Sequence, residues 1–213
     1  LISGGGAAIE FGESKFQNAD SSTNEAAYLN STGGYVYNDN FNSDNESLDN
    51  FTISMWVYPD QDMPTFASAF ATGDDTTNNN FQISDNGSSG IIAITENKSQ
   101  WLEAGTIAQD NWTHVTAVKY ADNNTLVLYL NGVVGINNML SCPDNTKDSC
   151  ADNNSLTSFN TNWEKLKIGV NRVSQSPWKG YIDEVKVYNR PLDSTEVNNL
   201  FRCDNPGGYG TCR

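Results

Sequence analysis

The segment Gly180–Phe201, GYIDEVKVYNRPLDSTEVNNLF, carries the most informative pattern in the sequence, because a strand-like half is followed directly by a helix-like half. Its first half alternates between two faces, which is typical of a β-strand. Strict alternation places Asp183 beside Val185 and Val187, on the face expected to meet the core. A carboxylate in that position needs compensation, because burial of an unpaired charge is very costly.

The second half of this segment predicts one short helix. Asp193 suits the N-cap position, and Glu196 follows three residues later, as in a capping box. Leu192 before the cap and Val197 after it can pack together as a hydrophobic staple. The chain therefore ends its last strand in a capped helix.

Upstream, short alternating runs predict further strands. FTISMWVYP, WTHVTAVKY and KLKIGV each fit a strand, and TLVLYLNGVVG fits two strands joined by the Asn131-Gly132 turn, since both turn positions accept positive φ. In FTISMWVYP one face carries Phe51, Ile53, Met55 and Val57. Repeated short strands with Gly, Asn and Asp turns favour an all-β antiparallel sandwich. We expect one domain over residues 1–202 and a C-terminal tail over residues 203–213.

Composition narrows the ligand classes. The 213 residues carry 12 Lys and Arg against 26 Asp and Glu, a net charge of −14. A nucleic-acid partner requires a basic face, so this class is disfavoured, as are polyanionic sugars and anionic membranes. No apolar run approaches membrane-spanning length. Divalent cations and neutral glycans remain compatible with the charge.

Four cysteines form two close pairs, Cys142 with Cys150 and Cys203 with Cys212. We expect two local disulfides, which implies an oxidising compartment. Zinc is the alternative, but it favours shorter spacings, and the single histidine, His114, lies far away in sequence. His114 falls within an alternating strand, where we expect a structural role.

Five motifs in order resemble the laminin-G-like, concanavalin A-like lectin family. GYIDEVKVYNRPLDSTEVNNLF resembles its closing strand and helix. AAYLNSTGGYVYN, NFTISMWVYP, NWTHVTAVKY and LYLNGVVG resemble earlier strands, and together the motifs span about residues 26–201. The resemblance implies a jelly roll of two antiparallel sheets with one short C-terminal helix. It constrains the ligand much less, because this fold serves many functions.

The resemblance also suggests calcium at Asp183. Related β-glucan-cleaving sandwich enzymes have a similar closing strand whose Asp holds a structural calcium. Here Glu10 and backbone carbonyls could complete an oxygen shell around Asp183. Hydrogen bonds from backbone N–H groups are the alternative compensation.

A second calcium or ligand site is suggested at the rim by a resemblance to pentraxins, which have an Asp-Asn pair at a similar place and acids in a later loop. The segment before one strand and the stapled long loop supply candidates for both, namely Asp74, Asp75, Asn79, Asn80, Asp144, Asp148 and Asp152. The alternative is a solvated polar loop, since Asn and Asp also favour turns.

Tryptophans are the remaining candidates. Trp56 and Trp112 fall within strand motifs, where we expect them in the core. Trp101, Trp163 and Trp178 lie near turns, where an exposed indole could stack on a sugar ring, although ordinary rim packing is the alternative.

No paired-acid strand, nucleophile elbow, metalloprotease helix or phosphate loop is present in the sequence. We therefore expect a secreted or cell-surface, noncatalytic domain that binds a glycan or surface ligand, with calcium as its expected cofactor. The alternatives are a module that contacts other subunits of a larger surface protein and an accessory carbohydrate-binding domain of a polysaccharide-degrading enzyme.

Overall fold

A computed structural model describes residues 2–4, 10–17, 23–30, 34–41, 49–73, 81–87, 90–95, 100–122, 125–135, 139–141, 163, 165–171 and 173–203. For residues 2–4, 10–17, 23–25, 92–95, 100–101 and 139–141 it describes the backbone only.

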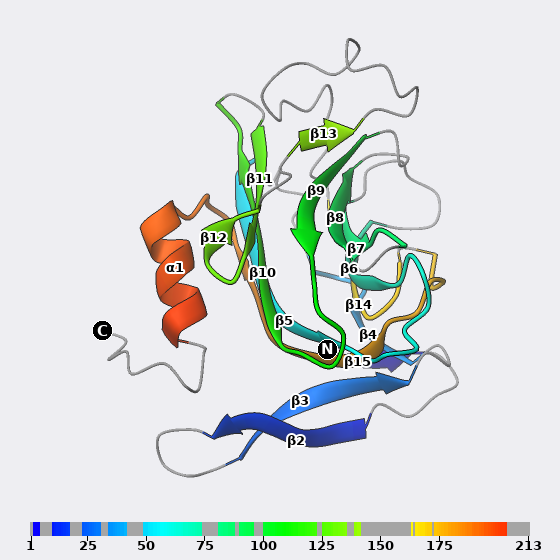
Figure 1. The fold of residues 1–213 in the computed structure, drawn as a ribbon. Helices are drawn as coiled ribbons and strands as arrows, with labels where there is room; N and C mark the ends of the chain where they lie inside the picture. The colour runs from blue at the N-terminus through cyan, green and yellow to red at the C-terminus, as the bar shows by residue number, and fades with distance from the viewer. Residues whose placement is uncertain are drawn as a thin grey trace.

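The described strands form two antiparallel sheets, and the fold is the predicted jelly-roll sandwich (Figure 1). An eight-stranded sheet has the order β1 (Ile2–Gly4), β4 (Tyr35–Asn38), β14 (Leu166–Ile168), β6 (Ser68–Thr72), β7 (Phe81–Asp85), β8 (Gly90–Thr95), β9 (Gln100–Thr106) and β13 (Met139–Ser141). A seven-stranded sheet has the order β12 (Val133–Val134), β11 (Thr125–Leu130), β10 (Thr113–Tyr120), β5 (Phe51–Pro59), β15 (Lys179–Tyr188), β3 (Thr23–Asn30) and β2 (Glu10–Gln17).

The main core lies between the two sheets. The predicted apolar face of β5 is fully buried there, and it meets apolar side chains of the opposite sheet such as Phe70, Phe81 and Leu102. Full burial of each such side chain contributes about 1.5–3 kcal/mol. The core therefore fixes the two sheets face to face and leaves the connecting loops at the ends of the sandwich.

The predicted hairpin is confirmed between β11 and β12. Asn131 and Gly132 have φ values of 50° and 76°, the positive values that this two-residue turn requires. Leu130 pairs with Val133 across the turn. The structure thus ends the seven-stranded sheet with the short edge strand β12.

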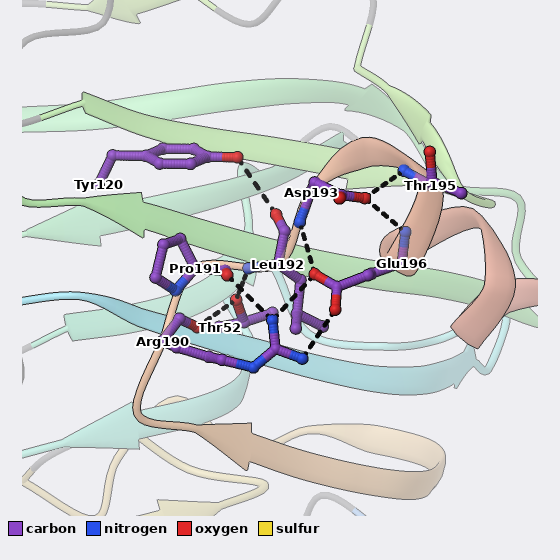
Figure 2. Close-up of polar contacts among 8 residues, drawn as sticks. All are labelled: Thr52, Tyr120, Arg190, Pro191, Leu192, Asp193, Thr195 and Glu196. Carbon is purple, nitrogen blue, oxygen red and sulfur yellow. Dashed lines mark hydrogen bonds and ion pairs between the residues drawn. The ribbon is translucent and has the colours of Figure 1, made fainter.

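The predicted helix is confirmed as α1 (Ser194–Cys203), which lies against the outer face of the seven-stranded sheet (Figure 1). Figure 2 shows its cap: Asp193 Oδ1 accepts 2.8 Å hydrogen bonds from the backbone N–H groups of Thr195 and Glu196. Glu196 in turn accepts from the Asp193 N–H at 3.0 Å. Leu192 and Val197 are buried in one small cluster, as the staple predicts.

A hydroxyl of the sheet fixes the approach to α1. Thr52 Oγ1 donates to the Arg190 carbonyl and accepts from the Leu192 N–H, both at 2.9 Å (Figure 2). Tyr120 donates its hydroxyl to the Leu192 carbonyl at 3.2 Å. No helix within the described residues combines the length and hydropathy needed to span a bilayer.

The alternation predicted for β15 is wrong at Asp183. Asp183 pairs with Trp56 on β5, whose ring packs on Phe201 of α1 outside the main core, while Ile182 is buried in that core. The register shifts between Asp183 and Lys186, and Glu184 adopts a positive φ of 50°. This bulge changes the parity of the strand, so that Val185 and Val187 do pack against the core although Asp183 does not face it.

Candidate functional site

The half-buried Asp183 accepts a 2.8 Å hydrogen bond from the Glu184 N–H, the kind of backbone compensation considered as the alternative to calcium. The Glu10 backbone pairs with Tyr28 on β3, and β3 lies between β2 and β15. The side chain of Glu10 is not described. Because Asp183 does not face the core, burial of its charge no longer calls for calcium. A calcium site at Asp183 stays a prediction.

Three tryptophan predictions are corrected. Trp163 and Trp178 are 0% exposed within the main core, so the predicted stacking of a sugar on these indoles is wrong. Their position near turns in the sequence did not reveal this burial. Trp112 is half-buried rather than in the core. The burial predicted for Trp56 is confirmed, since it is 3% exposed and packs on Phe201 of α1. The side chain of Trp101 lies outside the described part.

The two predicted rim segments lie outside the described residues, so their role in a site stays a prediction. The candidates there are Asp74, Asp75, Asn79, Asn80, Asp144, Asp148 and Asp152. Cys142, Cys150 and Cys212 are also outside it, so the disulfide pairing of Cys203 and of the long loop stays a prediction. Among the side chains that are described, no group of three His, Cys, Asp or Glu residues could hold a metal ion.

His114 is fully buried beneath α1, where a structural role fits better than catalysis. Its Nε2 shares a 2.8 Å hydrogen bond with Ser54 Oγ, and its ring contacts Trp56 and Phe201. Burial and, to a smaller extent, the charge of Lys186 together lower the pKa of His114 from 6.5 to about 3. The imidazole is therefore neutral at ordinary pH.

A pocket of about 130 Å³ opens at one end of the sandwich, where the loops after β5, β7 and β9 meet. Its apolar wall contains Pro59, Met63 and Ile107. Thr65, Asp85 and Gln109 supply its polar groups. The lining of this small hollow exposes more polar than apolar surface, and we call it the Asp85 pocket.

Asp85 organises the pocket from the end of β7. It is 3% exposed, and its Oδ2 accepts hydrogen bonds from the backbone N–H groups of Gly87 at 2.7 Å and Phe66 at 3.1 Å. The buried Oδ1 has no hydrogen-bond partner within the described part of the chain. One carboxylate thus ties the loop after β5 to the loop after β7.

Phe66 stands beside this carboxylate and is the most exposed aromatic side chain among those described. It is 57% exposed, although large apolar side chains usually avoid water. Its φ of 60° is unfavourable for a residue with a Cβ, and the hydrogen bond to Asp85 helps to hold it. The ring lies over Gly87, where an added Cβ would come within 3.0 Å of it. Phe66 is therefore fixed in an exposed position.

Backbone contacts hold the loops around the pocket in place. The Asp110 N–H donates to the Pro59 carbonyl at 2.8 Å, and the Gln61 amide donates to the Asp110 carboxylate. The Asp60 N–H donates to the Lys179 carbonyl at 3.1 Å. Two loops and the start of β15 are thereby joined, so the pocket exists before any ligand binds.

The sequence contains a weak signal for this site that the motif comparison missed. Phe66 follows Pro64 and Thr65 in a polar turn, and Asp85 precedes Asn86-Gly87 at the end of a strand. An aromatic residue in such a loop and an Asp before a turn are each common. Only the fold brings the two together through the Phe66 N–H and Asp85 Oδ2.

The two facing antiparallel sheets, between which the chain repeatedly crosses, define the class of jelly-roll sandwich domains. The chain belongs to the concanavalin A-like lectin/glucanases superfamily, whose laminin-G-like family model matches residues 30–198. The predicted family is thus confirmed. No curated protein sequence matches the chain.

Solved structures with the same fold include three of differing function. Domain 4 of AbnA, an extracellular arabinanase of Geobacillus stearothermophilus in complex with arabinotriose, has a TM-score of 0.57 at 20% identity and covers 92% of this chain and 82% of its own. The sialidase carbohydrate-binding module CBM40 of Ruminococcus gnavus, bound to α2,3-sialyllactose, has a TM-score of 0.55 at 15% identity. The match covers 73% of this chain and 84% of the module. The SAP-like pentraxin of Limulus polyphemus has a TM-score of 0.54 at 13% identity, and the match covers 74% of this chain and 72% of the pentraxin chain.

Proposed function

We propose that this chain is a noncatalytic glycan-binding domain and that the Asp85 pocket is its binding site. The observation that carries the proposal is an exposed Phe66, which a buried carboxylate of the pocket lining holds in an unfavourable backbone conformation and whose ring lies over Gly87 of the same lining. An arrangement that exposes apolar surface and strains the backbone is expected where a ligand contacts it.

The chemistry of the pocket suits a sugar. The face of an aromatic ring packs on the apolar C–H face of a sugar ring, which is the contact that Phe66 offers. Thr65 and Gln109 carry hydroxyl and amide groups that can bond to sugar hydroxyls. The arabinanase domain and the sialidase module with this fold are described with bound arabinotriose and sialyllactose, which supports glycans as the ligand class.

Charge favours a neutral glycan over an anionic one. The chain carries a net charge of −14, and Asp85 places a carboxylate at the site itself. A carboxylated sugar such as sialic acid would meet repulsion there. We therefore expect binding to neutral oligosaccharides and none to sialyllactose.

Calorimetric titration tests the site with a panel of neutral trisaccharides from arabinan, xylan, mannan and β-glucan, and with α2,3-sialyllactose as the anionic probe. We expect at least one neutral probe to bind and Phe66→Ala to weaken that binding at least tenfold, because the stacking surface is lost. Val134→Ala is the matched control, since Val134 is also an exposed apolar residue, at 48%, but lies on β12. Equal binding by Phe66→Ala and the wild type would place the site elsewhere, and binding of no neutral probe would contradict the glycan assignment.

Calcium remains a proposal, now attached to the rim residues rather than to a buried Asp183. Hard oxygen ligands suit calcium, and the rim segments are rich in Asp and Asn. If calcium binds there, a chelator should lower the melting temperature of the wild type and of Asp183→Ala equally. If the chelator lowers the melting temperature of the wild type but not of Asp183→Ala, calcium binds at Asp183. If the chelator changes neither melting temperature, the calcium proposal is wrong.

We infer a secreted or cell-surface location from the predicted disulfides. Peptide mapping without reduction tests those disulfides.

The alternative function, contact with other subunits, has one observation in its favour. Val133 and Val134 are 65% and 48% exposed on the edge strand β12. Edge strands offer unpaired backbone groups to a further strand. Concentration-dependent sedimentation that Val133→Lys abolishes would support this second function.

A further inference from the structure

A second aromatic surface lies on the outer face of the seven-stranded sheet, at the same end as the Asp85 pocket. It consists of Tyr28, Tyr58, Tyr181 and Trp112, all half-buried, and we call it the aromatic surface. Tyr181 pairs with Tyr58 on one side and with Tyr28 on the other, so the three tyrosines lie side by side across β5, β15 and β3. The surface faces outward, because the adjacent Ile182 is buried in the core.

The four rings hold one another in place. The ring centroids of Tyr28 and Tyr181 are 4.8 Å apart, and those of Tyr58 and Trp112 are 5.5 Å apart. Tyr181 also meets Tyr58 edge-on at 5.7 Å and Trp112 at 6.1 Å. These separations are typical of favourable aromatic pairs. A ligand would therefore meet rings that lose little conformational freedom on binding.

Carboxylates border the aromatic surface. The Tyr28 hydroxyl donates to Asp60 Oδ2 at 2.9 Å, and this hydrogen bond, followed by burial, raises the pKa of Tyr28 to about 12. Asp62 pairs with Lys179, and Asp110 accepts from Gln61. Carboxylates accept hydrogen bonds from hydroxyl groups but repel anions. The chemistry thus matches a neutral polyol better than a phosphate or a uronate.

Two chain segments connect the aromatic surface to the Asp85 pocket. Pro59 lines the pocket and directly follows Tyr58 of the surface. Gln109 lines the pocket and is three positions before Trp112 in the sequence. The hydrogen bond between the Asp110 N–H and the Pro59 carbonyl joins the two segments. The pocket and the aromatic surface are therefore built on the same two chain segments, which lie next to each other.

We propose that the aromatic surface is a second subsite that takes the continuing units of a neutral oligosaccharide whose first units occupy the Asp85 pocket. The inference rests on the proposed function and adds a dependence on chain length. The pocket alone should bind a trisaccharide, and a hexasaccharide of the same glycan should bind more tightly because it also stacks on the rings.

The test measures Kd by calorimetry for matched neutral trisaccharides and hexasaccharides of arabinan, xylan, mannan and β-glucan. We expect Trp112→Leu, which keeps an apolar side chain, to weaken hexasaccharide binding about tenfold and to leave trisaccharide binding unchanged. Phe66→Ala should weaken both. A readout without mutation is hydroxyl-radical footprinting of the wild type, in which the hexasaccharide should protect Trp112 and Tyr181 while the trisaccharide should not.

The outcomes separate this inference from the proposed function. If hexasaccharide and trisaccharide bind the wild type equally and Trp112 is never protected, the second subsite is overturned while the pocket stands. If Trp112→Leu weakens both probes and Phe66→Ala weakens neither, the aromatic surface is the primary site and the two-subsite order is overturned. If no probe binds, both proposals fail. Self-association of the wild type that Trp112→Leu abolishes, without glycan binding, would replace the glycan by a second copy of the chain.

Discussion

At the scale of single residues, His114 makes stability depend on pH. Its pKa in the folded chain, about 3, lies below its ordinary value of 6.5, so protonation favours the unfolded state. The stabilisation by the neutral imidazole is therefore complete above pH 6.5 and is lost as the pH falls toward 3. Between pH 7.5 and pH 5 the loss from this one group should be about 2 kcal/mol.

Urea unfolding of the wild type and of His114→Gln at both pH values measures this effect. Carboxylates titrate in both proteins, so the difference between the two pH dependences isolates the histidine. We expect the wild type to lose about 2 kcal/mol more than His114→Gln on acidification. Parallel losses in the two proteins would show that His114 titrates normally and is not buried as described.

Residue roles were the least predictable part of the site. The burial of Trp163 and Trp178 in the main core depends on contacts with residues far away in sequence, which a turn-rich sequence does not specify. The backbone conformation that exposes Phe66 is likewise held by a hydrogen bond that its N–H donates to Asp85, a residue 19 positions away. Such long-range pairs leave no local pattern in a single sequence.

At the scale of elements, α1 depends on its cap. Asp193→Ala should lower the free energy of unfolding by about 1 kcal/mol, because two backbone N–H groups lose their acceptor. Asp193→Asn should lose much less, since asparagine also caps helices well. Thermal unfolding of both variants, with the exposed Asn199→Ala as control, measures the difference. An Asp193→Ala protein as stable as the control would mean that docking alone maintains α1.

The elements themselves were largely predictable, because local chemistry specifies them. The Asn131-Gly132 turn, the core-facing residues of β5 and the Asp193 cap all appear where the pattern placed them. The bulge in β15 was not predictable, because Glu184 at a φ of 50° carries no glycine-like signal. That single irregularity turned Asp183 away from the core and reversed the argument for a buried carboxylate.

At the scale of the whole molecule, the packed parts of the sandwich are distinct from the end that carries the proposed binding site. Its core and the outer face beneath α1 are closed by packing, whereas one end presents the Asp85 pocket and the aromatic surface. The order of motifs predicted this architecture, since strand spacing and capping determine which sheets form. It did not indicate the Asp85 pocket, because the pocket depends on contacts between residues far apart in the sequence.

The central claim is that a neutral glycan binds in the Asp85 pocket. A titration of the isotopically labelled domain with the best neutral trisaccharide, followed by amide chemical shifts, tests it most directly. We predict the largest shifts at the amides of Phe66 and Gly87, both of which donate to Asp85. The amides of Thr195 and Glu196, which donate to Asp193 at the start of α1, should stay in place. Saturable shifts elsewhere, with Phe66 and Gly87 unchanged, would contradict it.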